Sequence, residues 1–274
     1  MVVFPNAKIN LGLHITKKRQ DGFHNIETVF FPVRGYNDVL EVLENKESTT
    51  DILSTSGIDT NAEPNDNLVM KALRLLREEL SIPPLKIHLH KNIPSGAGLG
   101  GGSSDAAFML QLLNEQFNLG LSVAILERKA SALGADCAFF VKNEPTLAKG
   151  IGNEFSPIEI DLNGLWLMLV IPPIHLSTPA SYKNITPRKP ANWLKEILDS
   201  EITKWPQLLI NDFEPNAFSA HPELQEIKKR LYDEGAIYAA MSGSGSAMFG
   251  LFSEKTEIDW PENFKVWIGK MGKE

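Results

Sequence analysis

Residues 93–107 read Ile-Pro-Ser-Gly-Ala-Gly-Leu-Gly-Gly-Gly-Ser-Ser-Asp-Ala-Ala, and five of these fifteen positions are glycine. So much glycine is costly in backbone entropy unless the chain bends sharply or approaches another group closely. Directly afterwards Ala106, Leu110, Leu113 and Phe117 recur at the spacing of a helix. A glycine loop that leads into a helix points free N–H groups and the positive end of the helix dipole at one place, which suits phosphate. We therefore expect this loop to hold the phosphates of a nucleotide.

The neighbouring segments argue against the alternative that this stretch is a flexible linker. Before it, residues 85–90 alternate apolar and polar side chains, which predicts a half-buried strand. After it, residues 103–117 carry the helical pattern. Ser103 or Ser104 is expected to cap this helix, because a serine hydroxyl can accept from a free N–H of the first turn.

Other known nucleotide loops fit this stretch less well. Gly96, Gly98 and Gly101 satisfy G-x-G-x-x-G, but residues 119–122 read Leu-Gly-Leu-Ser where a dinucleotide fold needs an acidic residue after a strand. No Lys-Ser or Lys-Thr follows the glycines, as a P-loop requires. The His-Arg-Asp and Asp-Phe-Gly motifs of protein kinases are missing from the sequence. What remains is a glycine loop that ends in two hydroxyls, which suit a phosphate contact and a magnesium ligand.

Four segments of the chain, in order, resemble the motifs of the GHMP kinases, a superfamily that includes galactokinase, homoserine kinase and mevalonate kinase. Residues 94–104, with Pro94 followed by Gly-Leu-Gly-Gly-Gly-Ser-Ser from residue 98, resemble the ATP loop. Residues 5–13, Pro-Asn-Ala-Lys-Ile-Asn-Leu-Gly-Leu, resemble the first motif. Residues 21–24, Asp-Gly-Phe-His, are similar to the D-G-Y-H element of one branch, and residues 241–246, Met-Ser-Gly-Ser-Gly-Ser, resemble the third motif.

The resemblance implies an α+β fold with two lobes. The expected N-terminal lobe, over residues 1–150, binds ATP and is similar to domain 2 of ribosomal protein S5. The expected C-terminal lobe, over residues 151–274, is ferredoxin-like. The residue patterns themselves indicate only a mixture of helices and strands, with neither a repeat nor a low-complexity tract.

The remaining patterns predict further elements. Apolar runs and alternation predict strands over 6–15, 26–33, 39–43, 138–141, 146–149, 165–171, 237–241 and 247–252. Helical spacing predicts helices over 66–80, from Ser122 to Gly134, and from Pro222 to Gly235. Residues 187–220 are expected to contain helical pieces, and residues 44–65 a polar loop with one short strand.

Composition and charge narrow the class of protein. The chain has 274 residues, 43% of them hydrophobic and 22% charged, which is typical of a soluble globular protein. A net charge of −7 argues against nonspecific binding to nucleic acid. The single cysteine, Cys137, excludes an intrachain disulfide and fits the reducing cytoplasm, and no apolar run is long enough to span a membrane. We expect a cytoplasmic monomer or homodimer with a small-molecule partner and no nucleic-acid or membrane partner.

The resemblance also assigns catalytic residues. Transfer of a phosphoryl group requires an acceptor hydroxyl in line with the γ-phosphate and neutralisation of the transferring charge. Residues 133–140, Leu-Gly-Ala-Asp-Cys-Ala-Phe-Phe, resemble the family's G-A-D-x-x-F-F, which makes Asp136 the carboxylate beside the hydroxyl. Lys8 in the first motif is then the lysine that stabilises the developing charge. From the pattern alone, Asp136 also reads as a turn residue and Lys8 as a solvent-facing strand residue. The family usually has Pro where this chain has Ala138.

The resemblance further assigns the binding residues. Magnesium is expected at Ser104, and Asn10 is expected to contact the hydroxyls of a polyol. Phe23, His24 and Tyr182 are expected to hold the cytosine of a cytidine-diphosphate-linked polyol, although His24 also reads as a turn histidine. The loop that is expected to hold ATP consists of Pro94, Ser95, Gly96, Ala97, Gly98, Leu99, Gly100, Gly101, Gly102, Ser103 and Ser104.

A second glycine cluster has more than one interpretation. Gly243, Ser244 and Gly245 are expected to line the phosphates of the acceptor or to support the first glycine loop. The alternative is a tight turn between two strands.

Other functions remain open at this point. A sister kinase would act on another alcohol, such as homoserine or mevalonate, but such an acceptor needs no aromatic pair like His24 and Tyr182. A catalytically silent sensor is disfavoured by the presence of Lys8 and Asp136. A dinucleotide-dependent oxidoreductase is the remaining alternative.

Overall fold

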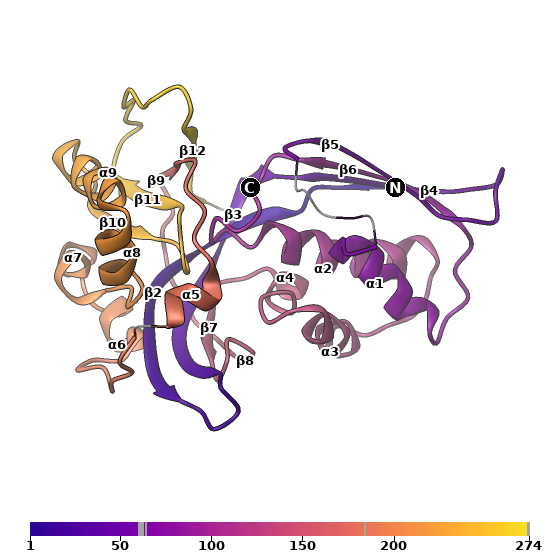
Figure 1. Ribbon diagram of the computed structural model, residues 1–274, viewed down its shortest axis with the longest axis horizontal. Helices are drawn as coiled ribbons and strands as arrows, with labels where there is room; N and C mark the ends of the chain where they lie inside the picture. The colour runs from indigo at the N-terminus through magenta and orange to yellow at the C-terminus, as the bar shows by residue number, and fades with distance from the viewer. Residues whose placement is uncertain (60–62, 64, 184, 273–274) are drawn as a thin grey trace. The chain divides into compact units, whose positions relative to one another are not determined.

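The computed structural model shows that the chain has a mixed α/β fold (Figure 1). It describes residues 1–59, 63, 65–183 and 185–272. The strands are β1 (Val2–Val3), β2 (Asn6–Lys18), β3 (His24–Asn37), β4 (Val39–Glu44), β5 (Ile52–Gly57), β6 (Leu85–Lys91), β7 (Thr146–Lys149), β8 (Glu154–Pro157), β9 (Trp166–Ile171), β10 (Tyr238–Met241), β11 (Met248–Phe252) and β12 (Lys265–Lys270). The helices are α1 (Leu68–Arg77), α2 (Gly101–Gln116), α3 (Val123–Leu133), α4 (Phe139–Lys142), α5 (Thr178–Tyr182), α6 (Leu194–Leu198), α7 (Trp205–Leu208), α8 (Glu214–Ala220) and α9 (Pro222–Asp233), with a 3-10 turn at Ile202–Lys204. β5 is the short strand predicted within 44–65, of which positions 60–62 and 64 lie outside the described residues.

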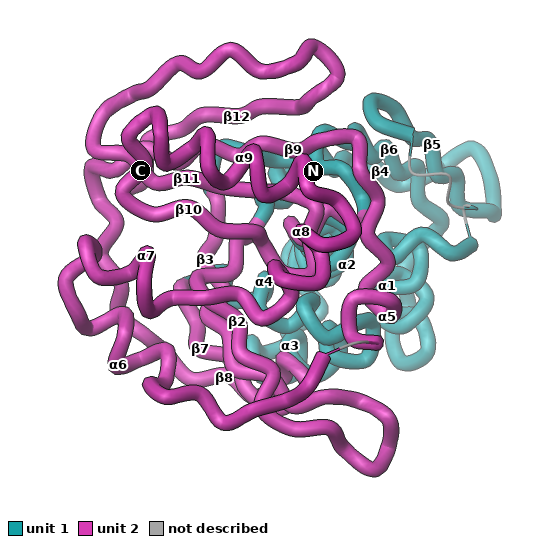
Figure 2. Tube along the Cα trace, turned by 60° about the vertical axis from the view of Figure 1, so that its left-hand side comes forward, with its two compact units in different colours: residues 1–7, 34–95, 100–144 teal, residues 8–33, 96–99, 145–274 magenta. Residues whose placement is uncertain are grey.

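The chain divides into two compact units that are made of interleaved segments, and Figure 2 colours them separately. Unit 1 contains residues 1–7, 34–95 and 100–144. Unit 2 contains residues 8–33, 96–99 and 145–274. The division into lobes at residue 150 is a different partition and stays a prediction.

Unit 1 is a four-stranded sheet in the order β1-β4-β6-β5 with helices on one face. β4 is antiparallel to β1 and β6, whereas β5 is parallel to β6. Leu85, Ile87 and Leu89 of β6 are buried and alternate with half-buried residues, as predicted. Figure 1 shows α1 and α2 against this sheet, and α2 in turn contacts α3 and α4. The alternating apolar residues therefore face a helical layer.

Unit 2 contains two sheets, in the orders β10-β11-β9-β12 and β2-β3-β7-β8. β9 is an interior strand of the first sheet, and its residues 167–171 are buried without alternation, as predicted. Helix α9 contacts β10 and β11 and buries its predicted stripe, Leu224, Ile227 and Leu231. Leu13 and Ile15 of β2 join the same apolar cluster. The N-terminal strands thus share a core with the C-terminal elements.

Some sequence predictions about elements are wrong. Residues 138–141 are not a strand but lie in α4 and the turn before it, because a short apolar run does not distinguish a strand from a buried helical turn. Neither Ser103 nor Ser104 caps α2, which begins at Gly101 after a left-handed Gly100. Strand β12 has no counterpart among the predictions, since Lys-Val-Trp-Ile-Gly-Lys lacks regular alternation. Among the described residues, every helix falls short of the length and apolarity that crossing a bilayer demands.

Candidate active site

Lys8 and Asn10 lie two residues apart on β2, and each side chain is only 3% exposed. Lys8 Nζ donates to Asn10 Oδ1 at 2.6 Å and to the Gly98 carbonyl at 2.9 Å, and it lies 5.1 Å from the centre of the Phe30 ring. Asn10 Nδ2 donates to Thr28 Oγ1 at 2.8 Å, which turns the amide oxygen toward the lysine. These hydrogen bonds compensate for the burial of the Lys8 side chain and hold its Nζ atom at the glycine loop rather than in solvent.

Residues 96–99 of the glycine loop are fixed within unit 2 by the turn between β10 and β11. The Gly98 carbonyl accepts from Ser242 Oγ at 2.8 Å, and the Ala97 carbonyl accepts from the Ala247 N–H at 3.0 Å. Gly98 has φ +79°, and a Cβ at this position would lie 2.0 Å from the Ser242 carbonyl oxygen. Only glycine can adopt this conformation so close to another backbone. The loop is therefore a rigid cradle and not a linker.

Helix α2 begins differently from the other two long helices of unit 1. The side chain of Asn67 caps α1 and that of Ser122 caps α3, whereas no side chain caps α2 in the part of the chain that the structure describes. The first amides of α2 are thus available to an anion. The Ser104 hydroxyl in this first turn is fully buried, and among the described residues it has no hydrogen-bond partner. An orphaned hydroxyl oxygen fits the expected magnesium ligand, since magnesium prefers oxygen.

A buried ion triad underlies the start of α2 in unit 1. Lys91, Asp38 and Asp105 are 2%, 0% and 3% exposed, and Lys91 Nζ binds both carboxylates, that of Asp105 at 2.6 Å. Asp38 Oδ1 also accepts from the backbone N–H groups of Asn92 at 2.6 Å and Ile93 at 2.9 Å. Burial raises the pKa of Asp105 against the opposing effect of Lys91. The triad ties the chain just before the loop to the helix just after it.

Sequence reasoning missed this triad and several supports of Lys8. Lys91 ends an alternating strand, and Asp38 reads as an ordinary turn residue, so neither carries a signal of burial. Thr28 and Asn211 were not predicted either, although Asn211 Nδ2 donates to the carbonyls of Met241 and Gly243 at 2.8 Å. Such residues are identified only by their hydrogen bonds to segments that are distant in the sequence.

Asp136 lies in the turn that connects α3 to α4 in unit 1 and is half-buried. The Cys137 N–H donates to the Gly134 carbonyl at 3.1 Å within this turn. Burial raises the pKa of the Cys137 thiol to about 11, which leaves it protonated and unreactive. Asp136 belongs to unit 1 and Lys8 to unit 2, and the surroundings of each are described within its own unit.

The structure brings two of the three predicted aromatic residues together. The rings of His24, at the start of β3, and Tyr182, at the end of α5, stack with centroids 4.8 Å apart and planes 15° apart. Tyr182 also meets the Phe213 ring edge-on at 4.8 Å. The Phe23 side chain is 60% exposed. Partial burial, with a smaller effect from the Lys18 charge, lowers the pKa of His24, which favours a neutral ring that can both donate and accept.

Gly243, Ser244 and Gly245 form the turn between β10 and β11. Gly243 and Gly245 have φ +56° and +86°, and Ser244 Oγ lies 2.9 Å from Thr178 Oγ1. Ser242, at the start of the same turn, donates to the Gly98 carbonyl of the glycine loop. The cluster is therefore a tight turn between two strands that also supports the glycine loop. Contact of this turn with acceptor phosphates stays a prediction.

Comparison with known proteins agrees with this geometry. Residues 67–144 match the family described as GHMP kinases N terminal domain, and residues 193–259 match GHMP kinases C terminal. The chain belongs to the GHMP kinases, and this confirms the expected fold. The mevalonate kinase of Methanococcus jannaschii shares that fold, with a TM-score of 0.68 at 14% identity over 99% of this chain and 98% of that one.

One branch of these kinases matches the chain over nearly its full length. The 4-diphosphocytidyl-2-C-methyl-D-erythritol kinase of Bacteroides fragilis is 54% identical over 259 residues, which cover 94% of both chains. Its namesake in Bacteroides thetaiotaomicron is 50% identical over 99% of this chain and 100% of that one. A crystal structure of 4-(cytidine 5'-diphospho)-2C-methyl-D-erythritol kinase gives a TM-score of 0.78 at 32% identity, over 92% of this chain and 90% of that one. Within the GHMP kinases, the chain therefore belongs to the 4-diphosphocytidyl-2-C-methyl-D-erythritol kinase family.

Proposed function

We propose that this chain transfers the γ-phosphoryl group of ATP to the 2-hydroxyl of 4-diphosphocytidyl-2-C-methyl-D-erythritol, in the non-mevalonate route to isoprenoids. Relatives of that name match nearly the full length of the chain. The observation that carries the reaction is the buried Lys8 ammonium, hydrogen-bonded to the Gly98 carbonyl within the glycine loop. A fixed cation at a phosphate cradle is the arrangement that phosphoryl transfer requires.

The proposed phosphate site is the loop from Pro94 to Ser104. Its support is the cradle conformation of Gly98 and the uncapped start of α2. The buried triad around Lys91 holds this start in place, so the amides need little reorganisation when the triphosphate arrives. Magnesium would be held by Ser104 Oγ. When it is bound, magnesium neutralises phosphate charge.

Asp136 and Lys8 are the proposed catalytic residues. Asp136 is to accept the proton of the acceptor hydroxyl or to orient that hydroxyl, and Lys8 is to stabilise the charge that develops on the transferring group. Asn10 is to bind a hydroxyl of the polyol. Its amide is already oriented by Thr28 and Lys8, which lowers the cost of ordering it on binding.

The proposed cytosine site contains His24 and Tyr182, with Phe23 nearby in sequence. Base–aromatic stacking contributes about 1–3 kcal/mol per base in nucleic-acid binders. The two rings are in direct contact at 4.8 Å, so a base can enter between them only if they separate. Gly243, Ser244 and Gly245 are the proposed contacts for the acceptor's phosphates.

We also propose that the enzyme acts in the cytoplasm on this small molecule alone, as a monomer or homodimer and without nucleic acid. The net charge of −7 and the single cysteine support this assignment.

The choice of acceptor is tested by assaying phosphoryl transfer from ATP to single alcohols. We expect turnover with the cytidine-diphosphate-linked polyol and none with homoserine or mevalonate. Turnover with either of the latter would assign the chain to a sister kinase. Reduction of a nicotinamide cofactor in place of phosphoryl transfer would overturn the kinase assignment altogether.

The catalytic residues are tested with Asp136→Asn and Lys8→Met. We expect Asp136→Asn to lower kcat by about 100–10,000-fold while ATP still binds, because only the proton-handling group is lost. Lys8→Met should also lower kcat, since the transferring charge loses its cation. Asp259→Asn and Lys255→Met, on exposed residues, are matched controls and should leave kcat unchanged. Full activity of Asp136→Asn would refute its assigned role.

A further inference from the structure

Helix α5 carries Tyr182, one of the two rings of the proposed cytosine site, but it has little stability of its own. It contains five residues, and none of them is buried. Forming the first turn of a helix fixes several residues for one hydrogen bond, so a helix this short persists only where other parts of the protein hold it. The place of the Tyr182 ring therefore depends on the contacts that hold α5.

The start of α5 is held by the turn between β10 and β11, and both belong to unit 2. Alternate residues of the segment 174–178 meet that turn in reverse order. The three contacts join Ile174 to Ser246, Leu176 to Gly245 and Thr178 to Ser244. The last is a hydrogen bond, with 2.9 Å between the hydroxyl oxygens of Thr178 and Ser244. It fixes the first residue of α5 on the turn that also supports the glycine loop.

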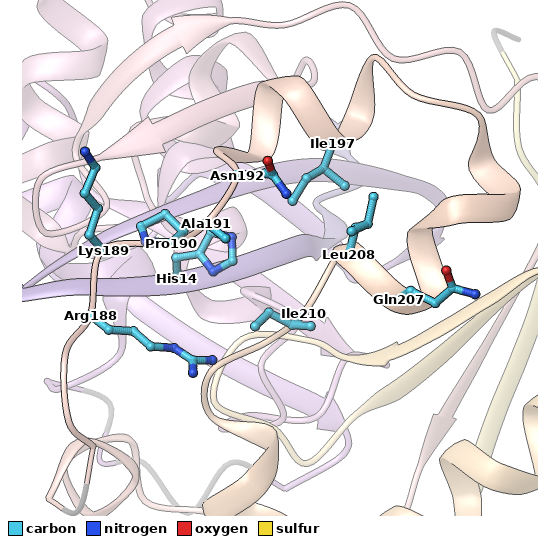
Figure 3. Close-up of a pocket in the computed structure, with 10 residues that line it drawn as sticks. All are labelled: His14, Arg188, Lys189, Pro190, Ala191, Asn192, Ile197, Gln207, Leu208 and Ile210. Carbon is cyan, nitrogen blue, oxygen red and sulfur yellow. The ribbon is translucent and has the colours of Figure 1, made fainter.

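Tyr182 lies four residues after Thr178, at the other end of α5. Residues four apart in a helix lie on the same face, one turn apart. On the far side of α5, the Arg188 N–H donates to the Ile15 carbonyl at 3.1 Å, where Arg188 lines the cavity that Figure 3 shows. That anchor lies six residues beyond Tyr182, so the hydrogen bond of Thr178 restrains the ring more closely.

The hydrogen bond between Thr178 and Ser244 takes one direction when a phosphate group is present. A hydroxyl group has one hydrogen to donate and two lone pairs that accept, whereas an ionised phosphate oxygen only accepts. When Ser244 donates its hydrogen to a phosphate of the acceptor, Thr178 must therefore donate to Ser244. Thr178 then orients the Ser244 hydroxyl as well as the start of α5.

We propose that Thr178 is a positioning residue for the acceptor. Its hydroxyl joins Ser244, a proposed contact for the acceptor's phosphates, to the helix that carries Tyr182, a proposed contact for the base. Thr178 acts on the acceptor through these two residues. The proposal rests on the proposed function, because it concerns how the same acceptor is held.

The first test locates the Tyr182 ring without using catalysis, in the full chain with histidine labelled for NMR. The ring current of the stacked Tyr182 should displace the imidazole signals of His24, which lie 4.8 Å away between centroids. Tyr182→Leu should abolish this displacement, and His24→Gln assigns the signals. Thr178→Val keeps the shape of the exposed side chain and removes its hydroxyl, so it should reduce the displacement.

Two matched variants separate the hydroxyl from a general effect on α5. Thr178→Ser keeps a hydroxyl at the same place and should keep the displacement of the His24 signals. Ser177→Ala removes the neighbouring exposed hydroxyl, which makes no capping bond to α5 among the described residues, and should also keep it.

The second test is steady-state kinetics with ATP and the cytidine-diphosphate-linked polyol. Thr178→Val should raise the KM for the polyol about two- to tenfold, the usual effect of losing one hydrogen bond. The kcat and the KM for ATP should not change, and Thr178→Ser should restore the KM for the polyol. In a Tyr182→Leu background, Thr178→Val should raise this KM less, because one of the two groups that Thr178 positions is gone.

The outcomes distinguish this proposal from the proposed function. Unchanged His24 signals in Thr178→Val, or an equal rise of the KM for the polyol in Thr178→Val and Thr178→Ser, would overturn the positioning role even if the parent chain phosphorylates the polyol. No turnover of the polyol by the parent chain would refute the proposed function instead. The His24 signals would then still decide whether Thr178 places the Tyr182 ring.

Discussion

Gly98 carries two constraints that no other residue type can meet together. Its φ of +79° lies in the left-handed region, and its α-carbon is so close to the Ser242 carbonyl that a Cβ would lie 2.0 Å from that oxygen. Its own carbonyl accepts from Lys8 and Ser242. A change at this residue therefore alters the phosphate cradle and the environment of Lys8 at once.

Gly98→Ala should raise the KM for ATP and lower the thermal unfolding temperature. The left-handed conformation alone costs an L-residue about 1–2 kcal/mol, and the clash with Ser242 adds to it. Gly235→Ala is the control, because Gly235 has φ +94° but nothing within 4 Å of its Cβ position. Steady-state kinetics and thermal unfolding of both variants separate backbone strain from the clash. An equal loss of stability and an unchanged KM for ATP in both variants would show that the contact with Ser242 is unimportant.

The three long helices of unit 1, α1, α2 and α3, differ in how their N-termini are capped. Asn67 Oδ1 accepts from the Val69 N–H at 2.9 Å at the start of α1, and Ser122 caps α3. The start of α2 has glycine at its cap and relies on the buried triad below it. Among these three helices, the two that have no place in the proposed phosphate site begin with a side-chain cap, and the start of α2, where an anion is expected, has none.

Asn67→Ala should lower the free energy of unfolding by about 1 kcal/mol, the usual contribution of an N-cap side chain. The KM for ATP should not change, because α1 has no place in the proposed site. Chemical denaturation and steady-state kinetics measure the two quantities. A large rise in the KM for ATP would show that α1 belongs to the nucleotide site.

The elements also show what the sequence can predict. Helices α1, α3 and α9 were predictable because an apolar stripe, a cap or a closing glycine marked each one. Helix α4 was not, since four apolar or basic residues carry no period and only packing against α2 and α3 decides their conformation. At the site, the glycine loop and Lys8 were found from motifs. The partners that fix them, such as Thr28 and Asp38, come from distant segments that only the fold brings together.

At the scale of the whole molecule, Asp51 links three elements of unit 1 and makes its stability depend on pH. Its carboxylate binds the Arg77 guanidinium at the end of α1 and accepts from the Leu85 N–H at 2.9 Å at the start of β6. Burial raises the pKa of Asp51, but the hydrogen bonds from Arg77 and Leu85 outweigh it and hold the pKa below 3.8. The native state therefore binds this proton more weakly than the unfolded chain does.

The contribution of Asp51 to stability is present above pH 3.8 and is lost as the pH falls through the lowered pKa of the native state. Asp51→Asn should reduce the free energy of unfolding at neutral pH and flatten its decline in acid. Asp259→Asn, at an exposed aspartate, should reproduce the parent curve. Denaturant titrations across the acid range measure this. Parallel acid limbs for the parent and Asp51→Asn would refute the assignment.

The interleaving of the two units dictates an order of events on the ribosome. Leu13, Ile15 and Ile26 leave the exit tunnel early, yet the apolar cluster that shelters them includes Leu231 and Phe252, which are translated some two hundred residues later. Closing such distant contacts is slow, because loop-closure entropy must be overcome first. The apolar residues of the N-terminal strands therefore stay exposed through most of translation. A molecular chaperone is expected to bind the nascent chain during that interval rather than the folded enzyme.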